Sequence, residues 1–219
     1  MLKINELFDL SHSMAGEFLA GFTWPWEALP HIKEEILRLI GTLPKDEYRE
    51  AAPQVWVHNT VTIAPTASLA GPAIIGANTV IRPGAFIRGS ALVGADCVVG
   101  NSVELKNVII FDHVQVPHYN YVGDSILGYG AHMGAGAVTS NIKSDRTNVV
   151  VRDGQERYET GLRKMGAMLG DHVEVGCNSV LNPGTVIGPE SRVYPLSSVR
   201  GYIPPKHIYK NNGEIAEIR

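Results

Sequence analysis

The sequence has little cysteine, no excess of basic residues and no long apolar run, and each of these absences excludes a class of protein. Only two cysteines, Cys97 and Cys177, occur in 219 residues. A disulfide framework is therefore excluded, and Cys177 has no companion at metal or disulfide spacing. The formal net charge is −3, so the composition gives no general signal for nucleic-acid binding.

The sequence also lacks the features of a membrane or secreted protein. No run of 18 apolar residues occurs, and the opening residues, MLKINELFDLSH, do not contain the apolar stretch of a signal peptide. We therefore expect a cytoplasmic protein with neither a membrane nor a nucleic acid as partner. Hydrophobic residues make up 44% of the chain, which is enough for one sizeable core.

The dominant feature of the sequence is a period of six residues between positions 57 and 110. Nine successive hexads begin with an aliphatic residue: Val57, Ile63, Leu69, Ile75, Ile81, Ile87, Val93, Val99 and Leu105. Four places further on in each hexad, the residue is small or β-branched, Cys97 included. A helix requires apolar residues every three or four positions and a single strand every second one. A period of six instead predicts short strands joined by tight corners, with three hexads in each coil of an all-β solenoid.

Residues 1–50 do not follow this period and are expected to form an N-terminal helical cap. Apolar residues at helical spacing, with Pro30 near the start and Gly41 at the end, predict a helix from about 30 to 41. A second helix is expected over residues 4–20. Because the ends of a solenoid need capping, we expect the intervening aromatic residues to close its open end: Phe22, Trp24 and Trp26.

The solenoid itself is expected to span residues 51–203 in roughly seven coils, judged from the hexad repeat. A C-terminal tail follows at 204–219. After Leu105 the period slips by one residue, and polar residues at about 139–165 predict an inserted loop with a hairpin around Asp153-Gly154. Function is expected to concentrate at the slip and the insertion.

Charged and titratable residues gather around this slip. His113, His118 and His132 fall within 20 residues of one another. Arg88 and Lys106 are 18 residues apart, which places them on one corner about 5 Å apart in the stacking direction. Two stacked cations repel each other unless an anion lies nearby. We therefore expect an anion site, with solvated surface charges as the alternative.

Four motifs in this region resemble those of a known family. They are R-P-G-A from Arg82, G-N-x-V-E-x-K from Gly100, H-x-x-Y-x-G-D from His118 and G-A-G-x-x-T-x-N from Gly134. In this order they resemble the acetyltransferase domain of the bacterial bifunctional enzyme of the UDP-N-acetylglucosamine pathway. The resemblance covers about residues 75–200. It implies a left-handed parallel β-helix, a homotrimer and acetyl-CoA as co-substrate, with no metal required and no nucleotidyltransferase domain in the chain.

The resemblance also implies a role for individual residues. His118 would be the general base that takes the proton of a sugar amine, because an imidazole titrates near neutral pH, and Glu104 would orient it. The remaining residues would bind the substrates. The phosphate of an amino-sugar phosphate or nucleotide-amino sugar would be held by Arg82, Lys106 and Tyr121. The rest of the acceptor would be contacted by Asn141, His132 and Arg146. The CoA groove would be lined by Ser179 and Ser197.

The sequence departs from the family between the first two motifs, where it is one hexad longer. We expect this hexad to move Arg82 to a different face from Lys106. Two other functions stay open. The His113–His118 spacing resembles a metal pair of the β-helical (γ-class) carbonic anhydrases, and His132 would complete a different triad, although zinc catalysis requires three ligands in reach. The third possibility is a non-catalytic partner of a sugar nucleotidyltransferase.

Overall fold

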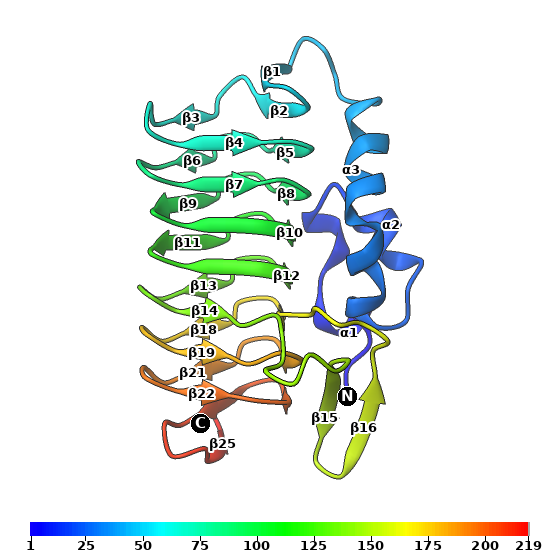
Figure 1. Cartoon of the computed structure of the whole chain (residues 1–219), viewed down its shortest axis with the longest axis vertical. Coiled ribbons are helices and arrows are strands. Elements are labelled where there is room, and N and C mark those ends of the chain that lie inside the picture. Colours follow the sequence, from blue (N-terminus) through cyan, green and yellow to red (C-terminus); the bar gives the residue numbers. More distant parts are fainter. Residues whose placement is uncertain (219) are drawn as a thin grey trace.

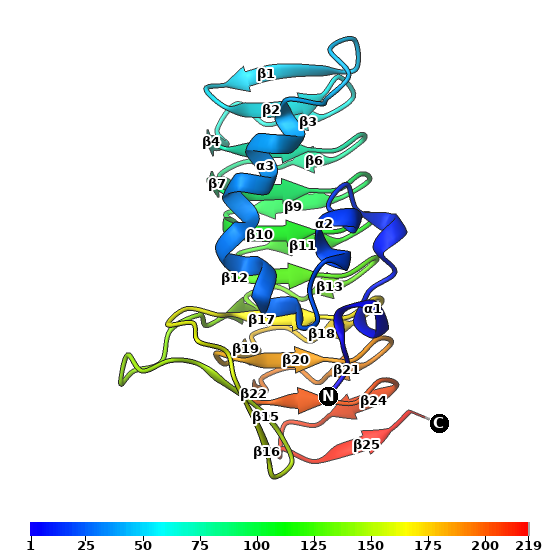
Figure 2. The same cartoon turned by 90° about the vertical axis from the view of Figure 1, so that its right-hand side faces the viewer.

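The computed structural model, which describes residues 1–218, is a left-handed parallel β-helix with helices along one side (Figures 1 and 2). Its three walls are formed by strands that stack in register. The first wall contains β2 (Val55–His58), β5 (Ala73–Ile75), β8 (Ala91–Val93), the end of β10 (Glu104–Ile110), the end of β12 (Tyr121–Leu127), β17 (Ala167–Leu169), β20 (Thr185–Ile187) and β23 (Tyr202–Ile203). The second contains β3 (Thr62–Ile63), β6 (Val80–Ile81), β9 (Val98–Asn101), β11 (Gln115–His118), β13 (His132–Met133), β18 (Glu174–Val175), β21 (Arg192–Val193) and β24 (His207–Tyr209).

The solenoid has about nine turns, not the roughly seven predicted, and β24 of the second wall lies in the predicted tail. The third wall has strands in seven of these turns. It contains β4 (Ser68–Ala70), β7 (Phe86–Arg88), the beginnings of β10 and β12, β14 (Val138–Thr139), β19 (Val180–Leu181) and β22 (Ser198–Val199). At the two ends, the antiparallel strands β1 (Tyr48–Ala52) and β25 (Ile215–Glu217) pair with β2 and β24. We call the turns between the first and second, second and third, and third and first walls the first, second and third corners.

The hexad leaders form the core, as the period predicted. Seven of the nine are buried, whereas Ile63 and Leu69 are half-buried because they lie in the first coil. Cys97 points inward as expected, and burial raises the pKa of its thiol to about 12. The core is therefore one continuous apolar column, typical of a solenoid.

The slip of the period has a simple structural cause at the third corner. Leu105 and Ile110, and again Val122 and Leu127, are five residues apart instead of six. The corner there contains one residue fewer, so β10 and β12 run without a break from the third wall into the first and pair along their whole length. Two successive coils are thus shortened at one corner.

The N-terminal helices do not close the end of the solenoid, so the predicted position of the cap is wrong. They are α1 (Ile4–Leu7), η1 (Leu10–His12), α2 (Gly16–Ala20), η2 (Pro25–His31) and α3 (Ile32–Ile40). The helix predicted at about 30–41 is confirmed as α3, but the one predicted over residues 4–20 is divided into short pieces. Helix α3 packs against β5, β8 and β10 on the side of the solenoid (Figure 2), with Ile32, Ile36 and Leu39 buried. The described residues include no helix that is both long and apolar enough to span a membrane.

The inserted segment contains the predicted hairpin, formed by β15 (Val150–Asp153) and β16 (Glu156–Glu159). Figure 1 shows it beside the lower coils, on the same side as the helices. The tryptophans expected to plug the solenoid instead contact this hairpin. Trp24 and Trp26 stack at 5.4 Å, and Trp24 meets the ring of Tyr158 at 5.1 Å. The N-terminal segment and the insertion therefore support each other.

Candidate functional site

The predicted site residues lie along the third wall and at the two corners that bound it. Glu104 and Tyr121 are neighbours in register on the outer surface of this wall. Lys106 follows at the third corner, and His118 precedes Tyr121 at the second corner. Most of the motif residues of the central coils are thus brought onto one continuous surface.

Asp124 is the centre of a polar network at the third corner. It is 4% exposed and accepts hydrogen bonds from Asn107 Nδ2 at 2.9 Å and Asn141 Nδ2 at 2.5 Å. Lys106 Nζ lies 3.5 Å from its Oδ1, and Asn141 also donates to the hydroxyl of Tyr121 at 3.2 Å. The network holds Lys106, Tyr121 and Asn141 together, because a buried carboxylate needs partners to stay buried.

The importance of Asp124 was missed at the sequence level, although it is the last residue of the H-x-x-Y-x-G-D motif. The available signal was the slip, since Asn107 and Asp124 occupy the two shortened corners. Burial raises the pKa of Tyr121, and the nearby Asp124 and Glu104 raise it further. Tyr121 therefore stays protonated at neutral pH and keeps its hydroxyl available as a donor.

Arg88 and Lys106 stack on one corner as predicted, but each has its own carboxylate partner. Ile87 is in register with Leu105, so the two cations are adjacent. Arg88 Nη1 donates to Glu104 Oε1 at 2.9 Å, and Lys106 is paired with Asp124. The protein's own carboxylates account for the stacking, so repulsion between these cations no longer argues for an external anion.

His118 is exposed at the second corner, and hydrogen bonds fix its main chain there. Its N–H donates to Asn120 Oδ1 at 3.1 Å, and its carbonyl accepts from Gly136 N at 3.0 Å. Asn120 is 2% exposed and donates to the carbonyls of Gly134 and Ala137. Within residues 1–218, the His118 ring has no hydrogen-bonding partner, and Glu104 binds Arg88 instead. The prediction that Glu104 orients the imidazole does not fit this arrangement.

Arg82 lies away from Lys106, as the additional hexad predicted. It follows Ile81, which is in register with Val99 and, through it, with Val116. Arg82 is therefore at the second corner, two coils from His118 and about 10 Å away along the axis at the usual strand spacing. The structure does not bring Arg82 and Lys106 to one phosphate position.

The three histidines considered as a metal triad are separated. His113 is at the first corner, 3.8 Å from Asp96, whereas His132 is on the second wall, where its Nδ1 lies 2.9 Å from Glu174 Oε2. No group of three potential His, Cys, Asp or Glu ligands occurs among the described residues. His132 is also on a different wall from Asn141, so one chain does not combine them in one sugar site.

The residues assigned to the CoA groove are not accessible. Ser179 and Ser197 are buried, and both hydroxyls donate to the carbonyl of Tyr194, at 3.1 and 2.7 Å. The predicted contact of these hydroxyls with CoA is therefore wrong, because they stabilise the second corner from inside. Arg146 is exposed in the turn after Asn141, where its N–H donates to the carbonyl of Lys143.

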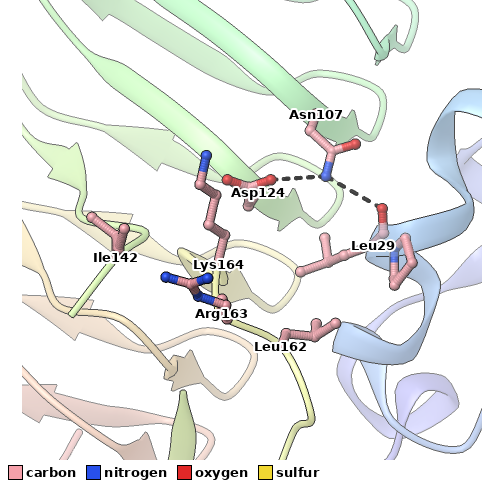
Figure 3. Close-up of a pocket in the computed structure, with 8 residues that line it drawn as sticks. Leu29, Asn107, Asp124, Ile142, Leu162, Arg163 and Lys164 are labelled. Carbon is pink, nitrogen blue, oxygen red and sulfur yellow. Dashed lines mark hydrogen bonds between the residues drawn. The ribbon is translucent and has the colours of Figure 1, made fainter. Parts of the chain in front are cut away.

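A pocket of about 500 Å³ opens beside Asp124 (Figure 3). Leu29 and Pro30 of η2 form one side, and the end of the inserted segment forms another, with Arg163 and Lys164. Asn107 links η2 to the solenoid, since its side chain donates to both the carbonyl of Leu29 and Asp124. Sequence reasoning missed Arg163 and Lys164, because nothing in their local pattern shows that the insertion returns to this corner.

Comparison with known proteins finds relatives that match a part of this chain. The chain is 39% identical over 97 residues to a bifunctional sugar-1-phosphate nucleotidylyltransferase/acetyltransferase of Sulfurisphaera tokodaii, covering 44% of this chain and 24% of the relative. It is 35% identical over 148 residues to the bifunctional protein GlmU of Trichormus variabilis, covering 68% of this chain and 25% of the relative. The chain thus spans about a quarter of the length of these relatives.

One similar solved structure is PerB from Caulobacter crescentus in complex with CoA and GDP-perosamine. The identity is 15% and the TM-score 0.40, with 74% of this chain and 56% of PerB covered; this similarity is too low to support a functional argument. A family model, by contrast, matches residues 69–194, more than half of the chain. The protein therefore belongs to the GMPPB C-terminal domain family.

Proposed function

We propose that the protein is an acetyl-CoA-dependent N-acetyltransferase that acts on an amino-sugar phosphate or a nucleotide-amino sugar. The observation that carries this proposal is the position of His118, exposed and held by Asn120 at the edge of the wall that carries Tyr121, Lys106 and Asn141. The name of the Sulfurisphaera relative includes acetyltransferase, and the similarity of such relatives covers their acetyltransferase region.

The geometry supports a direct transfer. The acceptor amine attacks the carbonyl carbon of the thioester while His118 takes the proton that the amine loses. The C–S bond breaks, and the CoA thiolate leaves and is protonated. An imidazole is suited to this role because it is partly neutral at physiological pH.

The polar network at the third corner is the proposed site for the anionic end of the acceptor. Lys106 and Tyr121 present donors there, and Asp124 and Asn141 hold them in place. We also propose a homotrimer with the second corner as its contact surface. Large apolar side chains are exposed at both ends of this corner's central coils: Tyr119 by 66% and, three coils further on, Tyr194 by 44% and Leu196 by 72%. Exposed apolar surface of this kind is typical of an interface. A monomer mass in light scattering would contradict this assembly.

The activity is tested by following release of free CoA thiol from acetyl-CoA with a panel of acceptors. We expect turnover with amino sugars that carry a phosphate or a nucleotide and much less with unphosphorylated amino sugars. The product should be an amide, which mass spectrometry identifies. If CoA binds but no amino sugar of the panel is acetylated, the proposed reaction is wrong; if CoA does not bind, a non-catalytic role replaces it.

Lys106→Ala should lower kcat/KM for the phosphorylated acceptor at least about tenfold, which corresponds to roughly 1.4 kcal/mol of transition-state binding. The reason is the loss of charge-assisted hydrogen bonds to the phosphate. Lys33→Ala, which removes the same charge from the exposed side of α3, should leave kcat/KM unchanged. Thermal unfolding of both variants shows whether loss of the Lys106–Asp124 contact has lowered stability, so that this effect can be told from loss of phosphate binding. If a folded Lys106→Ala variant keeps its kcat/KM, the phosphate does not bind there.

A further inference from the structure

A second, smaller pocket lies between the inserted hairpin and the lower coils of the solenoid. It has a volume of about 200 Å³ and is lined by Lys143, Arg152, Arg157 and Arg200 together with Val150, Pro183 and Gly201. Four of the seven lining residues are cations and none is acidic. Figures 1 and 2 show the hairpin β15–β16 beside these coils.

Two glycines of the third corner allow the hairpin to approach so closely. Gly201 has a φ of +74°, and a Cβ at this position would lie 2.7 Å from the carbonyl oxygen of Arg152. Gly184 has a φ of +82°, and its Cβ would lie 2.8 Å from Cγ1 of Val149. Both positions favour glycine for their conformation and for the contact. The hairpin is thus fitted to the wall, and the pocket is part of the fold.

The positive charge of the four cationic side chains in this pocket is not fully balanced by nearby carboxylates. Arg152 and Arg157 stand directly opposite each other in the antiparallel pair of β15 and β16, where like charges destabilise. Within residues 1–218, neither Arg152 nor Arg200 has a carboxylate within salt-bridge distance. Lys143 and Arg157 contact Asp145 and Glu159 at 3.4 and 3.6 Å, but these two carboxylates are 56% and 67% exposed and do not line the pocket.

The pocket is separate from the proposed catalytic surface. Lys106 and Arg200 lie on the same corner, but the register that runs from Leu105 to Val199 through β12, β14 and β19 places them four coils apart. At the usual strand spacing this is about 19 Å. The Asp124 network is not part of its lining, so a second ligand group or a second ligand is required to explain the charge.

We propose that this pocket binds the diphosphate group of a small ligand. Three guanidinium groups and an ammonium group surround it, and guanidinium groups bind phosphate oxygens through two parallel hydrogen bonds. A diphosphate bridges the opposed Arg152 and Arg157 and reaches Arg200 across the pocket, which removes their mutual repulsion. Nucleoside diphosphates and CoA both carry this group, and it is the shared diphosphate that the pocket recognises.

The test is calorimetric titration of the full chain with inorganic pyrophosphate at two salt concentrations. We expect saturable binding that weakens as salt rises and that is at least about tenfold tighter than binding of orthophosphate. Arg200→Gln and Arg152→Gln should each weaken pyrophosphate binding about tenfold or more. Arg49→Gln, which removes an exposed cation of β1 at the other end of the solenoid, should bind as the unmodified protein does.

Uridine diphosphate and CoA, titrated in the same way, distinguish the two sources of the diphosphate. The ligand that competes with pyrophosphate and loses affinity in Arg200→Gln is the one that uses the pocket. If pyrophosphate does not bind, binds no better than orthophosphate, or binds equally to folded Arg200→Gln and Arg152→Gln, the proposal is overturned. Pyrophosphate binding should be unchanged in His118→Ala, so this outcome is independent of the proposed acetyl transfer.

Discussion

Replacing His118 with alanine is expected to lower the turnover number for acetyl transfer by about 10²–10⁴-fold, the usual contribution of a positioned general base. His118 is exposed, and the corner is held by Asn120 and by main-chain hydrogen bonds that alanine retains. The variant should therefore fold and should bind CoA with unchanged affinity. Thioester consumption at saturating acceptor measures the loss.

A histidine at another corner provides the matched control. His113 is exposed at the first corner, in the left-handed conformation with a φ of 60°. His113→Asn should keep full turnover, because asparagine tolerates this backbone conformation. The pH profile of the turnover number provides a second measurement. The part of this profile that reports ionisation of the general base should be absent in His118→Ala and present in His113→Asn. Wild-type turnover in His118→Ala would show that another group accepts the proton.

Replacing Phe111 with alanine is expected to lower the free energy of unfolding by about 3–5 kcal/mol, the usual loss for a fully buried phenylalanine. Phe111 follows Ile110 at the first corner, where the equivalent residue of other coils is glycine: Gly76, Gly94, Gly128, Gly170 and Gly188. It is nevertheless fully buried, because the N-terminal segment covers it and Phe8 packs on its ring at 5.2 Å. Phe111 thus anchors this segment to the solenoid.

Chemical denaturation and limited proteolysis measure the two consequences of the Phe111 substitution. Because glycine is tolerated at the same corner of other coils, the wall should persist while residues 1–43 become more accessible to protease. Leu37→Ala, at a position that is 39% exposed, should change stability by less than about 1 kcal/mol, as expected for a surface site. An unchanged stability of Phe111→Ala would show that Phe8 and its neighbours dock without this ring.

The stacking of the coils could be predicted from the sequence, because every hexad begins with an aliphatic residue that occupies the equivalent inward position of a wall. A residue six or eighteen places away in the sequence has a fixed position in a β-helix, so Arg88 and Lys106 were correctly placed next to each other. The displacement of Arg82 to another corner followed from the same arithmetic. The hairpin was predictable too, because Asp153-Gly154 is a local turn signal.

The partners of these residues were not predictable in this way. Asp124 and Glu104 neutralise the two stacked cations, and whether a carboxylate turns toward a cation depends on side-chain directions that the period does not encode. Ser179 and Ser197 were expected at a ligand groove but point into the wall, because small residues serve equally well on either side of a corner. Trp24 and Trp26 were expected at the solenoid end but contact Tyr158 of the hairpin.

The sequence by itself determined the solenoid, its three-wall coil and the alignment of the His118, Tyr121 and Lys106 motifs, because these depend on interactions that repeat with the period. The tertiary structure alone decided where the non-repeating segments dock. Residues 1–50 and 139–165 have no periodic partner, so their positions depend on single contacts such as Phe8 on Phe111 and Trp24 on Tyr158. The same docking creates both the pocket beside Asp124 and the cationic pocket at Arg200, since each is closed by side chains far apart in the sequence.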